Sequence, residues 1–171
     1  TPIARRLDEN LEEMRQRLGV GVTFDVIERG LEVGGKKAAC FFVDGFLKDK
    51  VTADALQQLQ RVERADSVPN TIKKLLEKTV SYFETDTVET LEEAIEEVLS
   101  GPMVLFIDGE RQAIVLDLRE YPVRGIAEPE LERVTRGSHE GFVETIVFNT
   151  AMIRRRLRDP ALRFEVQQVG L

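Results

Sequence analysis

Several residue types that mark common functional classes are missing or scarce. The 171-residue sequence contains no tryptophan, one cysteine and one histidine. A single cysteine excludes an intramolecular disulfide, and one histidine without nearby cysteines gives no zinc-binding cluster. Cys40 lies in the apolar run 38–43, which predicts a buried, unreactive thiol.

Catalytic patterns are equally scarce. The tripeptide Ser138-His139-Glu140 contains the residue types of a hydrolytic triad, but consecutive side chains diverge in space and form no relay. The acidic pairs of residues 92–97 have the spacing of a solvated helix face and need no substrate. The sequence therefore predicts a protein that is not an enzyme and that holds no metal and no cofactor.

Long apolar runs are absent as well. The most apolar stretch, 102–107, is far shorter than the ~20 residues that a membrane-spanning helix needs. The sequence shows no signal peptide. Its net charge of −7 disfavours a nucleic-acid partner, because such a partner needs a basic surface. By itself, the sequence predicts an acidic intracellular domain.

Apolar periodicity predicts the elements of the first part of the chain. Gly19 and Gly21 end a first helix, Gly34-Gly35 marks a two-residue hairpin, and Thr52 is the expected N-cap of a second helix. The predicted elements are a helix over 3–18, strands over 22–33 and 36–43, and a helix over 52–64.

A polar, proline-containing break at residues 65–70 is the best candidate linker. Beyond it, Asp86 and Thr87 are expected to introduce a helix, and Asp108-Gly109 is expected to turn a hairpin. The predicted elements are a helix over 71–79, a strand over 80–84, a helix over 88–99, strands over 103–107 and 113–118, a helix over 139–158 and a strand over 162–169. This order predicts an α/β (α+β) fold with two small consecutive subdomains, 1–66 and 67–171, built of mixed sheets and β-hairpins flanked by helices.

The basic residues of the C-terminal part are all of one kind. No lysine occurs after Lys78, and residues 119–163 carry nine arginines against seven acidic residues, a charge of +2 in a chain of −7. Arginine suits fixed, bidentate pairing with carboxylates, carbonyls or phosphates better than lysine does. The segment is therefore expected to hold a defined geometry.

The last predicted helix shows where these arginines are placed. Its acidic residues lie in the first turns and its arginines in the last, which complements the helix dipole. Its predicted apolar face consists of Phe142, Val143, Ile146, Val147, Thr150 and Ile153. Three successive arginines point about 100° apart, so at least one of them is expected to reach beyond its own helix.

Three roles compete for the arginines. They pin the loop 119–137 through its glutamates, they contact a subunit or a membrane, or they bind phosphate, which the net charge disfavours. We assign a structural interaction network to Arg124, Glu128, Arg133, Arg136 and Glu144. We assign an assembly or membrane-proximal contact to Arg154, Arg155 and Arg156.

A set of short motifs resembles a known family. They are Tyr121-Pro122-x-Arg124, Glu128-Pro129, Glu132-Arg133-Val134-x-Arg136-Gly137, Glu140-Gly141-Phe142-Val143-Glu144, Asn149-x-Ala151, Arg154-Arg155-Arg156, Asp159-Pro160 and Val169-Gly170. Together they are similar to the cytosolic N-terminal domain of GerA-type A subunits, membrane proteins of bacterial spore germination. Upstream, Leu18–Gly21, Phe24–Val26, Gly34–Lys37 and Phe41–Phe46 resemble the stage V sporulation protein AF branch. His139 departs from the family, which usually has arginine there.

The resemblance implies a function and partners. It implies a non-catalytic domain on the spore-core side of the spore inner membrane, continuing after Val169-Gly170 to a membrane domain. The expected partners are other membrane subunits of a germination complex, with a homo-oligomer of the full-length protein, and the expected role is assembly and gating of a receptor-like ion channel and of dipicolinate release. One alternative stays open: two α/β units form a cleft whose arginines bind a carboxylate such as an amino acid.

Overall fold

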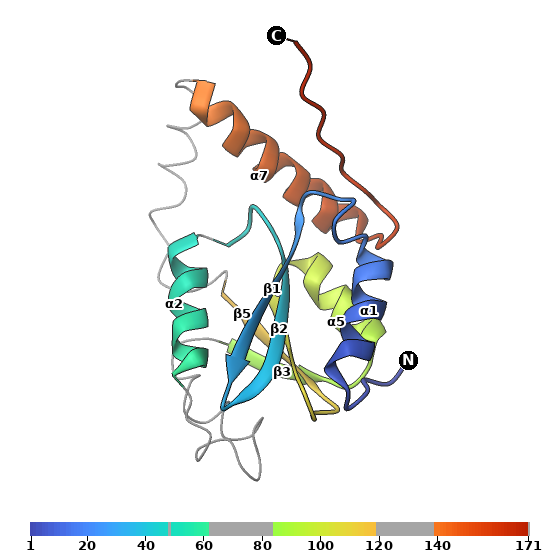
Figure 1. The fold of residues 1–171 in the computed structure, drawn as a ribbon. Coiled ribbons are helices and arrows are strands. Elements are labelled where there is room, and N and C mark those ends of the chain that lie inside the picture. The colour runs from blue at the N-terminus through green and yellow to red at the C-terminus, as the bar shows by residue number, and fades with distance from the viewer. Residues whose placement is uncertain (48, 62–83, 119–138, 171) are drawn as a thin grey trace.

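The computed structural model describes residues 1–47, 49–61, 84–118 and 139–170 (Figure 1). Five strands form one sheet in the order β1-β2-β4-β5-β3, and every pair of neighbours is antiparallel. The strands are β1 (Val26–Val33), β2 (Lys36–Val43), β3 (Glu84–Val88), β4 (Met103–Ile107) and β5 (Ala113–Asp117). The described helices are α1 (Leu7–Leu18), α2 (Asp49–Gln60), α5 (Leu91–Ser100) and α7 (His139–Leu157).

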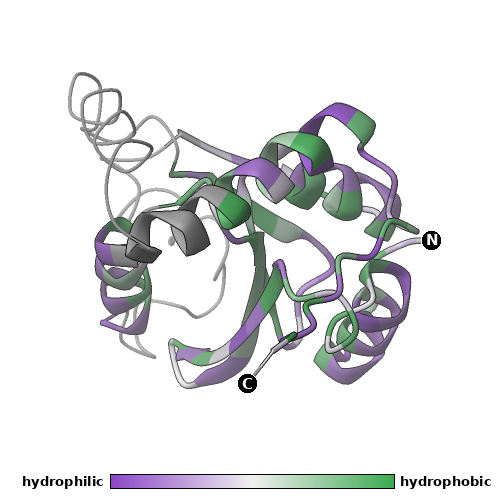
Figure 2. Cartoon of the chain, turned by 90° about the horizontal axis from the view of Figure 1, so that it is seen from above, coloured by the Kyte–Doolittle hydropathy of each residue, from purple (hydrophilic) through white to green (hydrophobic). Residues whose placement is uncertain are grey.

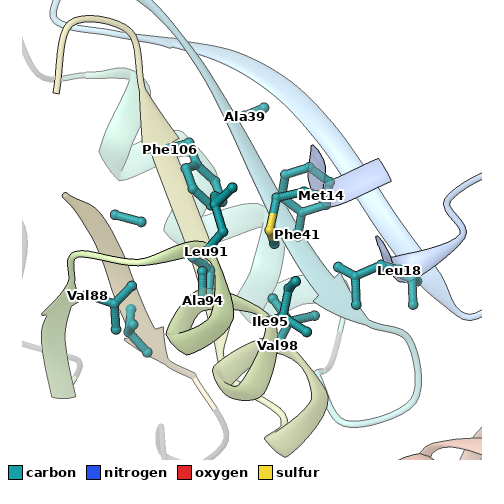
Figure 3. Packing of buried hydrophobic residues seen from close by; sticks show 14 of the residues in the cluster. Met14, Leu18, Ala39, Phe41, Val88, Leu91, Ala94, Ile95, Val98 and Phe106 are labelled. Carbon is teal, nitrogen blue, oxygen red and sulfur yellow. The ribbon is translucent and has the colours of Figure 1, made fainter. Parts of the chain in front are cut away.

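Helices cover both faces of this sheet, which explains the apolar runs of its central strands. Phe41 and Phe106 pack edge-to-face with ring centroids 5.9 Å apart, in the cluster that also holds the apolar residues of α1 and α5 (Figure 3). Cys40 and Leu105 belong to the cluster on the other face, which includes residues of α2. Because successive strand residues point to opposite faces, a strand covered on both sides is apolar throughout.

The helices bury one side only. Figure 2 shows hydrophobic and hydrophilic residues alternating along them, as expected for helices that pack one face on a sheet. The α/β class predicted from the sequence is confirmed. The predicted mixed sheets are wrong, since all paired strands run antiparallel and are joined by hairpins and crossovers.

The predicted glycine turns are confirmed. Gly34 and Gly35 have φ of 59° and 77° between β1 and β2, the left-handed conformations of a two-residue hairpin turn. Gly19 ends α1 with φ of 69°. Asp108, before the β4–β5 turn, accepts a hydrogen bond from the backbone N–H of Leu7 at 3.0 Å and so fixes the start of α1.

Two predicted helix starts are wrong. Helix α2 begins at Asp49, so Thr52 lies inside the helix and is buried there instead of capping it. Helix α5 begins at Leu91, with Thr90 as the cap whose Oγ1 accepts from Glu93 N at 3.2 Å. The proposed cap residues of α5, 86 and 87, pair with β5 as part of β3, so strand pairing overrides their capping preference.

The predicted boundary between two subdomains, 65–70, lies outside the described residues, as do the predicted helix over 71–79 and residues 80–83 of the predicted strand over 80–84. Strands from both sides of that boundary nevertheless meet, because Ala38–Phe41 of β2 pair with Val104–Ile107 of β4. The two predicted α/β units therefore share one sheet and its two clusters of buried residues.

The C-terminal part has the predicted helix but differs from the prediction in the buried face of that helix and in the segment after it. Helix α7 has the predicted start and ends within a residue of the predicted end. Of its predicted apolar face, the side chains of Phe142 and Val143 lie outside the described residues, Thr150 is buried, and Ile146 and Ile153 are exposed. Among the described side chains of the helix, 146–157, the other buried residues are Ala151 and Arg154. Residues 162–169 form no strand, because none of the described strands lies beside them.

Candidate functional site

The predicted interaction network lies almost entirely outside the described residues. Arg124, Glu128, Arg133 and Arg136 fall in the range 119–138, and the structure describes the backbone of Glu144 in α7 but not its side chain. The network stays a prediction. The arginines at the end of α7 are described in full, and they divide into one buried and two exposed residues.

Arg154 is fully buried and forms an ion pair with Asp25, which is also fully buried. Its Nε donates to Asp25 Oδ2 at 2.9 Å and its Nη2 donates to Asp25 Oδ1 at 2.8 Å. This parallel pair of hydrogen bonds is the strong, bidentate geometry of arginine and carboxylate. It joins α7 to the loop before β1 across 129 positions of sequence.

Thr23 completes the cluster. Its hydroxyl donates to Asp25 Oδ1 at 2.6 Å and accepts from Arg154 Nη2 at 3.2 Å. The same oxygen accepts from the backbone N–H of Phe164 at 2.9 Å. The Thr23 hydroxyl thus contacts the Asp25 carboxylate, the Arg154 guanidinium and the segment that follows α7, so its loss affects all three.

The segment after α7 is held by the same arginine. Arg154 Nη1 donates to the carbonyl of Leu162 at 2.8 Å, and its guanidinium carbon lies 5.0 Å from the centre of the Phe164 ring. Phe24 N donates to Phe164 O at 2.9 Å, and the two phenylalanine rings pack edge-to-face. We call Thr23, Asp25, Arg154, Leu162 and Phe164 the C-terminal clamp, because they fix the direction in which the chain leaves α7.

A second arginine, in the segment after α7, binds this segment to the end of α1. Arg163 Nη2 donates to the carbonyls of Gln16 and Arg17 at 3.4 and 3.3 Å, at the negative end of the α1 dipole. Its Nη1 donates to the carbonyls of Pro160 and Leu162. A Cβ on Gly19 would lie 1.9 Å from Arg163 Nε, so this position needs glycine both for its left-handed backbone and for space.

The turn after β2 supports α7 from below. A Cβ on Gly45, which has φ of 109°, would lie 2.7 Å from the carbonyl oxygen of Val147 and 3.0 Å from Cβ of Ala151. Asp44 N donates to the carbonyl of Asp25 at 2.8 Å. The Asp44-Gly45 turn therefore determines how closely α7 packs on the domain. It also fixes the position of Asp25, which pairs with Arg154.

Arg155 and Arg156 are exposed and lie in the last turn of α7. Arg158, with φ of 47°, follows the helix end, where its Nε donates to the carbonyl of Arg155 at 3.1 Å. The guanidinium of Arg154 has its partners inside the domain. Of the predicted assembly or membrane-proximal contact, Arg155 and Arg156 are therefore the members that a partner can reach.

Asp25 and Thr23 were not singled out as site residues by the sequence. The signal was faint: a polar residue on each side of Phe24, between a helix and a strand. Nothing local tells such residues from ordinary turn formers, because their partner lies more than 120 positions away.

Two features bear on catalysis and ligand binding. Burial raises the pKa of the Cys40 thiol to about 12, which removes it as a nucleophile. Over the residues that the structure describes, no three His, Cys, Asp or Glu side chains gather as a metal site would require. Those residues also include no helix long and apolar enough to cross a bilayer.

An open groove of about 480 Å³ lies between α1, α5 and the segment after α7. Three arginines line it, but two of them already have partners: Arg17 pairs with Glu13 and Glu92, and Arg163 binds the carbonyls at the end of α1. Arg158 is the third. The groove therefore offers a carboxylate ligand less free positive charge than its lining suggests.

Comparisons with known proteins agree on one family. The family described as Bacillus/Clostridium GerA spore germination protein matches residues 12–171. Stage V sporulation protein AF of Bacillus subtilis (strain 168) is 32% identical over 168 residues, covering 98% of this chain and 34% of that protein. Spore germination protein GerLA of Bacillus cereus is 31% identical over 165 residues, covering 96% of this chain and 33% of that protein. The chain thus spans about a third of the length of these relatives.

A solved structure has the same fold. It is the crystal structure of the N-terminal domain of the A subunit of the Bacillus megaterium spore germinant receptor GerK3. The match has a TM-score of 0.73 at 21% identity, and it covers 100% of this chain and 62% of the crystallised one.

Proposed function

Because the chain belongs to the GerA family of spore germination proteins, we propose that it is a non-catalytic domain on the spore-core side of a spore inner-membrane protein. In this role it contributes to the assembly and gating of a germinant-receptor-like channel and to dipicolinate release. The longer protein is expected to act with other membrane subunits and to form a homo-oligomer. The names of the relatives support a role in germination, and their greater length supports a membrane part outside these 171 residues.

The C-terminal clamp is the observation that carries this proposal. A domain that passes movement or force to another part of its chain needs a stiff connection at its exit, because a loose connection absorbs the movement. Here the exit is held by a buried ion pair, by Thr23 and by the end of α1. A shift of α7 or of the Thr23–Asp25 loop is therefore transmitted to residues 162–164.

Softening the clamp without unfolding the domain tests this proposal. Thr23→Val keeps the shape of the side chain but removes the hydroxyl that contacts Asp25, Arg154 and Phe164. Spores carrying Thr23→Val in the full-length protein should release dipicolinate more slowly, with normal amounts of the protein in the inner membrane. The matched control is Thr87→Val on the edge strand β3, where valine suits the strand.

Germination at the parental rate in Thr23→Val spores, with a loosened exit confirmed by hydrogen exchange at residues 162–164, would refute the proposed transmission. Slow germination in both variants would show a general loss of stability instead.

An arginine-lined groove beside α5 supports the alternative of a carboxylate-binding module. Calorimetric titration of the domain with dipicolinate and with amino acids tests it directly. Binding that Arg158→Gln abolishes, at unchanged melting temperature, would replace transmission by ligand recognition as the leading function.

A further inference from the structure

A cavity of about 890 Å³ lies at the end of the sheet away from α7. Its walls are the N-terminal segment with the start of α1, the residue after β3, and the turn between β4 and β5. Figure 1 shows the start of α1 and this turn together at that end of the sheet. The walls consist of residues 2–6 and Glu9, of Glu89, and of residues 109–112. The cavity shares no residue with the groove beside α5.

The wall formed by the N-terminal segment is held in place by hydrogen bonds. Gly109 N donates to the carbonyl of Arg5 at 2.7 Å. Asn10, which is 1% exposed, uses its amide on both backbone groups of Ala4: its Oδ1 accepts from Ala4 N at 2.8 Å and its Nδ2 donates to Ala4 O at 2.7 Å. The wall therefore has a fixed shape before a ligand arrives, which lowers the entropic cost of binding.

Two arginines line the cavity from different walls. Arg5 belongs to the N-terminal segment and Arg111 to the turn between β4 and β5. Both are exposed, and neither guanidinium has a hydrogen-bond or ion-pair partner among the described residues. The bond between Gly109 N and Arg5 O joins the two walls, so both side chains start from adjoining stretches of backbone. Their charges are therefore available to a bound group.

The acids of the lining do not cancel these charges. Glu9 lies 3.7 Å from Arg6 and Glu110 lies 3.7 Å from Lys36, each as an ion pair. Glu89 accepts a hydrogen bond from a glutamine amide at 3.0 Å and has no cationic partner among the described residues. Two arginines without a partner thus stand against one such carboxylate, so the cavity is net positive although the chain carries −7.

We propose that this cavity is a binding site for a small organic anion, in which Arg5 and Arg111 hold a phosphate or a carboxylate group. The parallel N–H groups of a guanidinium match the paired oxygens of such a group. The volume of the cavity is typical of small-molecule sites, and Pro2 and Ala4 offer apolar surface to the rest of the ligand.

The site goes beyond the proposed function and does not rest on it. Residues 2–9 precede residues 12–171, which match the family, so that match does not imply this cavity. The C-terminal clamp uses none of the residues that line it.

Nuclear magnetic resonance titration of the 171-residue chain with inorganic phosphate, and separately with succinate, tests the site. The backbone amides of residues 5–6 and 109–112 should shift and saturate at millimolar anion, while those of α2 should not. Added sodium chloride should weaken the binding, because salt screens charges at an exposed site. Tighter binding of phosphate supports a phosphate ligand, and tighter binding of succinate supports a carboxylate ligand. The absence of saturable shifts with both anions overturns the proposal.

Variants of the two arginines identify the binding groups. Arg5→Gln and Arg111→Gln should each weaken binding by about 10-fold or more, because each removes a charge-assisted hydrogen bond. Both side chains are exposed, so the melting temperature should stay unchanged. The matched control is Arg29→Gln, at an exposed arginine of β1 outside the cavity, and it should bind like the parent.

Two results overturn the assignment of these arginines. Binding that survives the double substitution Arg5→Gln with Arg111→Gln places the anion elsewhere. An equal loss in Arg29→Gln shows that the anion responds to overall charge and not to a site. None of these substitutions touches the clamp, so the Thr23→Val test of transmission is decided separately.

Discussion

Removing the arginine of the C-terminal clamp should destabilise the domain strongly. Arg154→Met keeps the length and apolar stem of the side chain but leaves Asp25 fully buried, with the Thr23 hydroxyl as its remaining side-chain partner. Breaking a buried ion pair on one side costs about 3–5 kcal/mol, because an uncompensated charge stays in the interior. The free energy of unfolding of a domain is about 5–15 kcal/mol, so this is a large share of it.

Urea or thermal unfolding of the domain measures this loss, and the melting temperature should fall by roughly 10 °C. Arg155→Met is the matched control, since Arg155 is the exposed neighbour on the same helix, and it should change stability by less than about 0.5 kcal/mol.

A double-mutant cycle identifies the cause. Adding Asp25→Leu to Arg154→Met removes the stranded charge, so the second substitution should recover stability instead of adding a further loss. A loss below about 1 kcal/mol for Arg154→Met, or losses that simply add in the double variant, would show that the ion pair is not the main contribution of the clamp.

Three further predictions follow from the described residues. Burial raises the pKa of Cys40 from 9.0 to about 12, so a thiol reagent should label the protein only on unfolding, and rapid labelling of the folded protein would contradict the burial. Because the thiol of the unfolded chain ionises at lower pH than that of the folded chain, the free energy of unfolding should fall as the pH rises from about 9 to about 12. Gly19→Ala should cost more than about 1 kcal/mol, since it strains a left-handed residue and displaces Arg163, and hydrogen exchange at residues 162–164 should rise with it. Unchanged exchange would show that Arg163 does not hold the segment after α7. Replacing both Arg155 and Arg156 by glutamine should change stability by less than about 1 kcal/mol while slowing germination at normal protein levels, and normal germination would remove the predicted partner contact.

Local elements were predictable where the signal is local. The Gly34-Gly35 hairpin and the Gly19 helix end follow from the left-handed conformations that glycine adopts without strain. The extent of α7 follows from its dipole-complementing charges and from Pro160 beyond its end. The start of α5 was predicted wrongly because residues 86 and 87 favour helix caps, and only the pairing of β3 with β5 showed that they belong to a strand.

The candidate site was predictable only in part. The density of arginine at the end of α7 indicated that at least one arginine reaches beyond its own helix, and Arg154 does so. Which of the three it is depends on the rotation of α7 about its axis, and that rotation is set by the contact of Val147 and Ala151 with Gly45. The same rotation exposes Ile146 and Ile153, which the helical period had placed on the buried face.

The sequence by itself determined the α/β class, the hairpins, the burial of Cys40 and the family, because each of these depends on local period, turn chemistry or motif. Only the tertiary structure decided that the strands join in one antiparallel sheet and that Asp25 meets Arg154. The physical reason is distance along the chain. A strand needs a neighbour and a buried charge needs a counter-charge. In this protein β2 pairs with β4 from the later part of the chain, and the counter-charge of Asp25 lies 129 positions away.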